Sequence, residues 1–274
     1  MKYLVSTLKY LFIEKKARNM IVFIIFALVP SILVCCAIAP ENFVKNINNP
    51  PAYANWGELW LSYFRSPRAL IVLAIGLLFC ILSASLISSC IVYHFRIGKF
   101  KLPNVLRACN DYFFPSLFYS LMIVFILALG YTLYTTFAYL WFCTISKIAY
   151  TVMCYITLFI LLLLTSLTIS ALTFWYPSMI IRGIYEKGAM LNAFYQSRGK
   201  QKVLLPSNLI MTVVVVIAFV IAYFVRKLPF IAIVISAVGI ALVFVFNITY
   251  TIIVYFGENM LTREDLLQSP YKRR

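Results

Sequence analysis

Six apolar stretches alternate with short polar segments along the chain, and each is long enough to cross a bilayer. They occupy residues 20–38, 69–93, 115–131, 149–175, 209–225 and 230–256. A transmembrane helix needs about 20 predominantly apolar residues, and none of these stretches contains Asp, Glu, Lys or Arg. The pattern therefore predicts an all-α fold, a polytopic transmembrane helical bundle of six spans with short interfacial helices between them.

The segment before the first span, residues 1–19, combines apolar and basic residues at helical spacing. Leu4, Leu8, Leu11 and Phe12 form the apolar side, and five Lys and Arg residues form the polar side. Such an amphipathic helix lies in the membrane interface. It is either a docking or lipid-sensing helix or an ordinary topogenic anchor.

The longest segment predicted to lie outside the membrane, residues 39–68, contains a row of aromatic side chains. After a turn, apolar residues recur at helical spacing at Trp56, Leu59, Trp60, Tyr63 and Phe64. Because Trp and Tyr favour the headgroup level, this row predicts a helix lying on the outer membrane surface. The alternative is an exposed aromatic patch that binds a ligand.

The second span carries small residues at every fourth position, at Gly76, Cys80, Ala84 and Ser88. A face of small residues lets another helix approach closely. We therefore expect this span at the centre of the bundle, with Ile87 and Ile91 facing lipid.

Asn247 is the one amide deep in a predicted span. A hydrogen bond from Asn247 to a neighbouring helix is the expected role, and a substrate-binding amide is the alternative. The intramembrane Ser and Thr hydroxyls are expected to bond to carbonyls four residues earlier or to neighbouring helices.

The polar segments differ in charge between the two sides of the membrane. Of the 24 Lys and Arg residues, 18 lie in the four segments that share a side with the two chain ends. Basic residues are enriched in cytoplasmic segments, so both termini are expected in the cytoplasm and the protein in the plasma (inner) membrane. The chain is predicted to be a single integral membrane domain, residues 1–274, with six spans within 20–256 and a cytoplasmic tail at 257–274.

Composition narrows the class of protein further. The chain is 64% hydrophobic and 12% charged, with a mean hydropathy of +0.94, far from the composition of a soluble domain. Its net charge of +16 is assigned to a fringe facing anionic headgroups, not to nucleic-acid binding. Seven cysteines form no CxxC motif and His94 is the single histidine, so no metal or other cofactor is expected.

Two parts of the chain, residues 82–116 and 164–207, share a pattern. LSASLISSC at 82–90 resembles LTSLTISAL at 164–172, and each copy ends on a Pro-Ser pair that opens an apolar run. The same order and orientation in both copies indicate a parallel repeat, and convergence between apolar helices is the alternative. Each copy holds a basic elbow segment. Six residues of the two segments together are expected to contact anionic lipid headgroups: Arg96, Lys99, Lys101, Arg107, Arg182 and Lys187.

The elbows contain Leu106-Arg107-Ala108 and Leu191-Asn192-Ala193. A span, an elbow with this Leu-x-Ala core and another span, twice over in six helices, resembles the membrane domain of bacterial glycerophosphodiester phosphodiesterases and of related uncharacterised six-helix bacterial membrane proteins. The resemblance covers roughly residues 80–225. We do not expect the catalytic domain of those enzymes within this chain, so the resemblance implies no catalytic residue.

The chain contains no P-loop, HExxH or GxSxG motif, and its intramembrane serines have no base at hand except His94. We therefore expect no enzyme, but a module that organises lipid or a partner protein at the cytoplasmic face. The alternative is the permease subunit of a transporter driven by a separate ATPase. The expected partners are membrane lipid, a cytoplasmic ATPase or another membrane protein, and the sequence indicates no oligomeric state.

Overall fold

The computed structural model describes residues 2–13, 18–48, 50, 53, 55–66, 68–97, 102–182 and 187–258. Within these residues the fold is all-α, and the single β-bridge joins Ile38 to Phe64. Six helices are long and apolar enough to cross a membrane, which confirms the predicted six-span bundle. These are α2 (Arg18–Ala37), α5 (Ala69–Ile97), α7 (Phe113–Thr144), α8 (Lys147–Leu172), α11 (Gln201–Phe224) and α12 (Pro229–Glu258).

The spans differ from the sequence prediction mainly at their ends. α7 continues through the aromatic segment 134–142 and reaches 32 residues, or about 48 Å at 1.5 Å per residue. That length exceeds the hydrocarbon core of about 30 Å, so α7 extends beyond the core or crosses it at a tilt. The fourth span ends at Leu172, and a turn separates it from a further helix, α9 (Trp175–Arg182).

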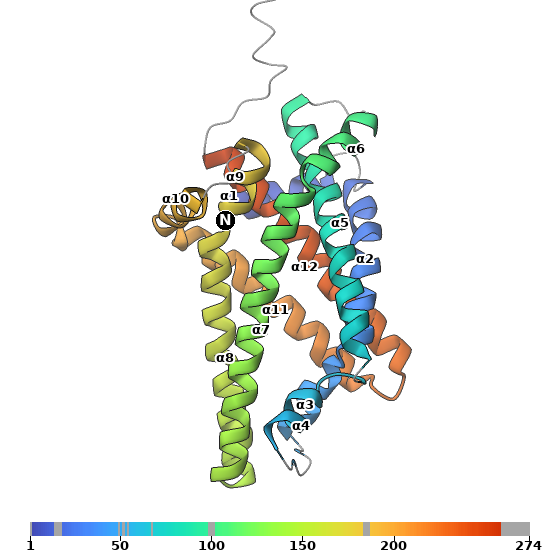
Figure 1. Ribbon diagram of the computed structural model, residues 1–274, viewed down its shortest axis with the longest axis vertical. Helices are drawn as coiled ribbons and strands as arrows, with labels where there is room; N and C mark the ends of the chain where they lie inside the picture. The colour runs from blue at the N-terminus through green and yellow to red at the C-terminus, as the bar shows by residue number, and fades with distance from the viewer. Residues whose placement is uncertain are drawn as a thin grey trace, which may run out of the picture.

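The spans pack as a sequence of neighbouring pairs. α2 lies against both α5 and α12, α12 pairs with α11, and α11 in turn contacts α8. α7 and α8 form a hairpin that stands beside this group (Figure 1). α5 also reaches α7, so the second span touches three other spans, α2, α7 and α12, and α12 likewise touches three, α2, α5 and α11.

Short helices gather at the end of the bundle where α12 finishes, which we call the elbow end (Figure 1). They are α1 (Lys2–Leu8) with the π-helical turn η1 (Lys9–Ile13), α6 (Leu102–Asp111), α9, and α10 (Lys187–Arg198). α6 lies between α5 and α7, whereas two short helices, α9 and α10, lie between α8 and α11. Each copy of the proposed repeat therefore has at least one short helix between two spans.

The opposite end, the loop end, carries α3 (Pro40–Asn48) and α4 (Trp56–Leu61). α4 begins where the predicted outer helix begins, whereas α3 was not predicted. Asn42 Nδ2 donates to the Ser62 carbonyl at 2.9 Å, and Asn46 Nδ2 donates to Ser62 Oγ at 2.8 Å. These bonds fold the segment into a compact cap.

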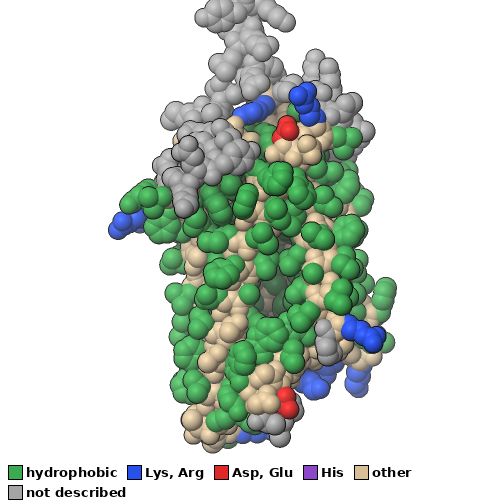
Figure 2. Space-filling model, in the orientation of Figure 1, with side chains coloured by type: hydrophobic (Ala, Val, Ile, Leu, Met, Phe, Trp, Pro, Cys, Tyr) green, Lys and Arg blue, Asp and Glu red, His purple; other side chains and the backbone are tan. Residues whose placement is uncertain are grey.

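On the face drawn in Figure 2, charged side chains lie toward the two ends of the molecule, and the long middle is mostly hydrophobic. Large apolar side chains such as Phe118, Phe125 and Phe159 are exposed along α7 and α8. Soluble proteins rarely expose contiguous apolar surface of this extent. The surface suits hydrocarbon, and the protein is a multi-pass membrane protein.

The N-terminal lead is docked on the bundle instead of lying apart from it. Tyr10 and Leu11 are buried in the main core, and α1 contacts α12. The predicted grouping of Leu8, Leu11 and Phe12 on one face is therefore wrong, because Leu11 packs inward while Leu8 and Phe12 are exposed. The lead is apolar on two sides, one for the bundle and one free.

Candidate functional site

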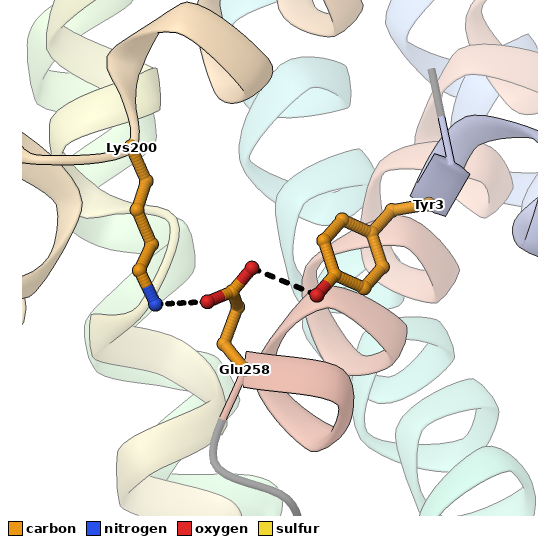
Figure 3. Close-up of polar contacts among 3 residues, drawn as sticks. All are labelled: Tyr3, Lys200 and Glu258. Carbon is orange, nitrogen blue, oxygen red and sulfur yellow. Dashed lines mark hydrogen bonds and ion pairs between the residues drawn. The ribbon is translucent and has the colours of Figure 1, made fainter.

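A cluster of polar side chains at the elbow end joins three distant parts of the chain (Figure 3). Glu258, the last residue of α12, forms an ion pair with Lys200, which stands between α10 and α11. Its other oxygen, Oε1, accepts a 2.7 Å hydrogen bond from the Tyr3 hydroxyl of α1. We call Tyr3, Lys200 and Glu258 the terminal cluster, because it ties the N-terminal helix to the end of the last span.

Aromatic rings complete the surroundings of the terminal cluster. Nζ of Lys200 lies 5.6 Å from the centre of the Phe174 ring, within the range of a cation–π contact. The Tyr3 ring lies over Gly257, where an added Cβ would come within 2.5 Å of Tyr3 Cε1. A side chain at position 257 would therefore displace the ring that holds Glu258.

The environment of Tyr3 favours its neutral form. Burial, followed by the hydrogen bond to Glu258 and that carboxylate's charge, raises the pKa of Tyr3 to about 12. A proton on the phenol is what allows it to donate to Glu258, and the raised pKa of Tyr3 keeps that proton in place through the neutral range.

A second group of hydroxyls is buried where α5, α7 and α9 meet. The Tyr176 hydroxyl lies 2.5 Å from Ser88 Oγ and 2.9 Å from Ser116 Oγ. The Tyr176 ring also stacks on Tyr119 at 4.8 Å between ring centres. We call Ser88, Ser116 and Tyr176 the hydroxyl cluster. Its members satisfy one another, which fits a structural joint between the two halves of the bundle.

The second half of the bundle has a corresponding joint. Asn208 Nδ2 of α11 donates to Ser170 Oγ of α8 at 2.6 Å, and Ser170 Oγ donates to the Ser166 carbonyl at 2.7 Å. Ser170 occupies the repeat position of Ser88, and Asn208 follows the second Pro-Ser pair directly. The sequence prediction missed Asn208, because it began the fifth span one residue later.

The small face predicted on the second span packs unevenly. Gly76 lies against Leu33 and Val34 of α2, and an added Cβ would come within 3.2 Å of Leu33 Cβ. Ala84 and Ser88 are buried, while Cys80 is partly exposed.

The assignment of Ile87 and Ile91 to lipid is wrong. Both are fully buried, at 0% exposure, in the main core. α5 contacts α2, α7 and α12, so partners cover this part of the helix on more than the small face. The exposed side chains of α5, such as Ile71, Ile75 and Leu78, lie nearer the loop end.

Asn247 reaches across from α12 to α11, where its Nδ2 lies 3.6 Å from the Met211 sulfur. Thioether sulfur is a weak acceptor, so this contact is weaker than the bond made by Asn208. Asn247 is partly buried and faces a neighbouring helix.

The six basic residues predicted to meet lipid have different surroundings. Arg96 donates from Nη2 to the Ile181 carbonyl at 2.7 Å and so joins α5 to α9. Arg107 is exposed on α6. The other four predictions fall outside the described part of the structure: Lys99 and Lys101 altogether, and Arg182 and Lys187 in their side chains.

The aromatic row at the loop end is packed, not free. Leu59 and Tyr63 are buried, and the Tyr63 ring lies edge-on to Tyr131 and Tyr134 of α7 at 5.8 and 6.3 Å. Trp60 contacts Tyr131 in the same way. The row therefore joins the loop-end cap to α7, and Trp56 is its exposed member.

In the described residues, no three His, Cys, Asp or Glu side chains lie together in a way that could hold a metal ion. No protein-family model, curated protein or solved structure matches this chain. The site must therefore be interpreted from its own chemistry, which is ion pairing and hydrogen bonding among helices at the elbow end.

Proposed function

We propose that this protein is a non-enzymatic membrane module that organises anionic lipid at its elbow end, on the cytoplasmic side of the plasma (inner) membrane. One observation carries the proposal: two helices at this end expose apolar stripes beside basic residues. α1 and η1 expose Val5, Leu8 and Phe12 next to Lys9. A helix of this kind inserts its apolar stripe below the headgroups while its basic residues attract anionic lipid.

α10 repeats the arrangement. Leu191, Phe194 and Tyr195 are exposed at positions i, i+3 and i+4, and Arg198 follows on the same side one turn later. In Figure 2, the edge of the molecule formed by α10 shows hydrophobic side chains beside a basic one. The exposed stripes lie next to helices that the terminal cluster ties together, so lipid bound there would contact a defined surface.

Native mass spectrometry of protein released from bilayers of phosphatidylcholine and phosphatidylglycerol tests this function. We expect the wild-type protein to retain phosphatidylglycerol in preference to phosphatidylcholine. Replacement of Lys99, Lys101 and Arg107 by Gln should reduce that preference. Each basic residue near an anionic surface contributes about 1 kcal/mol. Arg96 is kept, because its bond to Ile181 holds α9 in place.

The control replaces three basic residues of the loop end, Lys45, Arg226 and Lys227, by Gln. This variant should retain phosphatidylglycerol as the wild type does. Equal retention of the two lipids by the wild-type protein would contradict the proposal.

The permease subunit is a second candidate, because α6 and α10 lie between consecutive spans at one end, where coupling helices would contact an ATPase. An ATPase that co-purifies with the protein and detaches when Leu191 and Phe194 are replaced by Ser would favour this candidate. Under the lipid proposal, the same replacements change lipid retention alone.

A further inference from the structure

The corner between α10 and α11 is a fixed part of the elbow end. α10 ends at Arg198, and α11 begins at Gln201 after two residues. Ser197 Oγ donates to the Ala171 carbonyl of α8 at 2.8 Å, and the Lys200 amide donates to the Ser197 carbonyl at 2.9 Å. These bonds hold the corner against the end of α8.

One face of α10 holds it to the bundle and the other is open. Ala193 and Ser197 are buried, whereas Leu191, Phe194 and Tyr195 are 57%, 47% and 62% exposed. We call the last three the α10 stripe. An exposed Tyr next to Leu and Phe suits the level where lipid headgroups meet acyl chains.

Two exposed basic residues follow the α10 stripe in the chain. Arg198 and Lys202 are exposed on the two sides of the corner. Glu258, the carboxylate that contacts the corner, is bonded to Lys200 and Tyr3, so its charge is already engaged. The first turn of α11 adds the partial positive charge of a helix N-terminus.

We propose that the α10–α11 corner is a binding site for one anionic phospholipid. Arg198 and Lys202 hold the phosphate, and the α10 stripe contacts the glycerol backbone and the upper acyl chains. The inference rests on the proposed function and assigns it a site. The guanidinium of Arg198 supplies paired N–H donors for phosphate oxygens, which a lysine alone does not.

The two parts of the site make separate contributions. The stripe alone would hold a neutral lipid as well as an anionic one, and the two basic residues alone would hold free phosphate. Together they select a lipid that carries a net negative charge.

The test uses the full chain in nanodiscs that contain phosphatidylcholine and phosphatidylglycerol, with native mass spectrometry of the released protein. In Arg198→Gln/Lys202→Gln we expect preferential phosphatidylglycerol retention to fall about thirtyfold, because each basic residue contributes about 1 kcal/mol, and neutral lipid should be unchanged. In Leu191→Ser/Phe194→Ser both lipids should be retained less. All four side chains are exposed, so the thermal unfolding midpoint should stay at the wild-type value.

The matched control, Arg226→Gln/Lys227→Gln, removes two adjacent charges at the loop end and should behave as the wild type. If the wild type prefers phosphatidylglycerol and Arg198→Gln/Lys202→Gln prefers it equally, the site is wrong while the proposed function stands. If the wild type shows no preference, the proposed function fails as well.

Two further outcomes would overturn the assignment of the ligand. Inorganic phosphate at about 10 mM, a concentration above the millimolar dissociation constant of a weak anion site, should not release bound phosphatidylglycerol. Its release would show that phosphate alone is recognised. A dimer that disappears in Leu191→Ser/Phe194→Ser would show that a second copy of the chain covers the stripe.

Discussion

The hydroxyl of Tyr3 donates a 2.7 Å hydrogen bond to Oε1 of Glu258, across 255 positions of sequence. This bond, with the ion pair from Glu258 to Lys200, connects the first helix, the last span and the α10–α11 corner. One carboxylate thus contacts both α1, which carries one exposed stripe, and the corner that follows α10, which carries the other. A change at Glu258 is expected to alter the placement of both.

The effect of Gly257→Ala on stability tests the docking of α1, because the sign of that effect should depend on Tyr3. Within a helix, Gly→Ala normally stabilises by about 1 kcal/mol. Here the new Cβ would meet the Tyr3 ring at 2.5 Å, so Gly257→Ala should destabilise the protein by about 1 kcal/mol. In a Tyr3→Ala background the obstacle is gone, and Gly257→Ala should stabilise it. Unfolding in detergent measures both.

Gly199→Ala is the control, because no heavy atom lies within 4 Å of an added Cβ at that position. Its effect should be the same with and without Tyr3. A Gly257→Ala effect that is equally independent of Tyr3 would contradict the docking of Tyr3 over Gly257.

Stability should depend on pH through Tyr3 only under alkaline conditions. Its folded-state pKa of about 12 exceeds the ordinary value of 10.0, so folding favours the protonated phenol. The contribution is complete below pH 10 and is lost as the pH rises through 12. The difference in unfolding midpoint between wild type and Tyr3→Phe should be constant at neutral pH and shrink over this alkaline window. A difference that changes around neutral pH would contradict the account.

Much of the fold follows from the sequence, because hydrocarbon requires long apolar helices with internally bonded backbones. The six spans were predictable for that reason, and the start of α4 was predictable from its aromatic row. The packing faces were not. Lipid and protein interior are both apolar, so a span such as α5 shows no contrast between them, and Ile87 and Ile91 were assigned to the wrong side.

The terminal cluster and the hydroxyl cluster depend on tertiary contacts that no local pattern records. The predicted fourth span ends at residue 175 and no role is predicted for Tyr176, yet Tyr176 lies fully buried, bonded to Ser88 and Ser116. Asn208 had one available signal, its place directly after a Pro-Ser pair that opens a span. Basic residues in elbows were predictable as a class, but Arg96 proves to bond a backbone carbonyl.

The same substitution, Ala→Leu, at a buried and at an exposed position of α5 tests whether its small face packs closely against a neighbour. Ala84 is buried and Ala74 is exposed. Ala84→Leu should destabilise the fold by about 1–3 kcal/mol through overpacking, and Ala74→Leu should be nearly neutral. Thermal unfolding of the two variants in the same detergent provides the measurement. Equal unfolding midpoints for the two variants would show that no helix packs closely against the small face at Ala84.

Asn208 and Asn247 should differ in their contribution to stability. Asn208 donates to Ser170 Oγ at 2.6 Å, whereas Asn247 meets the sulfur of Met211 at 3.6 Å. Asn208→Ala should cost about 1–2 kcal/mol, and Asn247→Ala less than about 0.5 kcal/mol. In a Ser170→Ala background the cost of Asn208→Ala should fall, and an unchanged cost would exclude the bond as its cause.

Labelling of single cysteines shows which side of the membrane the elbow end faces, and we expect the cytoplasmic side. In a cysteine-free background, Gly199→Cys marks the elbow end and Ser66→Cys marks the loop end, both at exposed positions. A membrane-impermeant maleimide should label Ser66→Cys in intact cells, and Gly199→Cys only in inside-out vesicles. Labelling of Gly199→Cys in intact cells would place the elbow end outside and contradict the account.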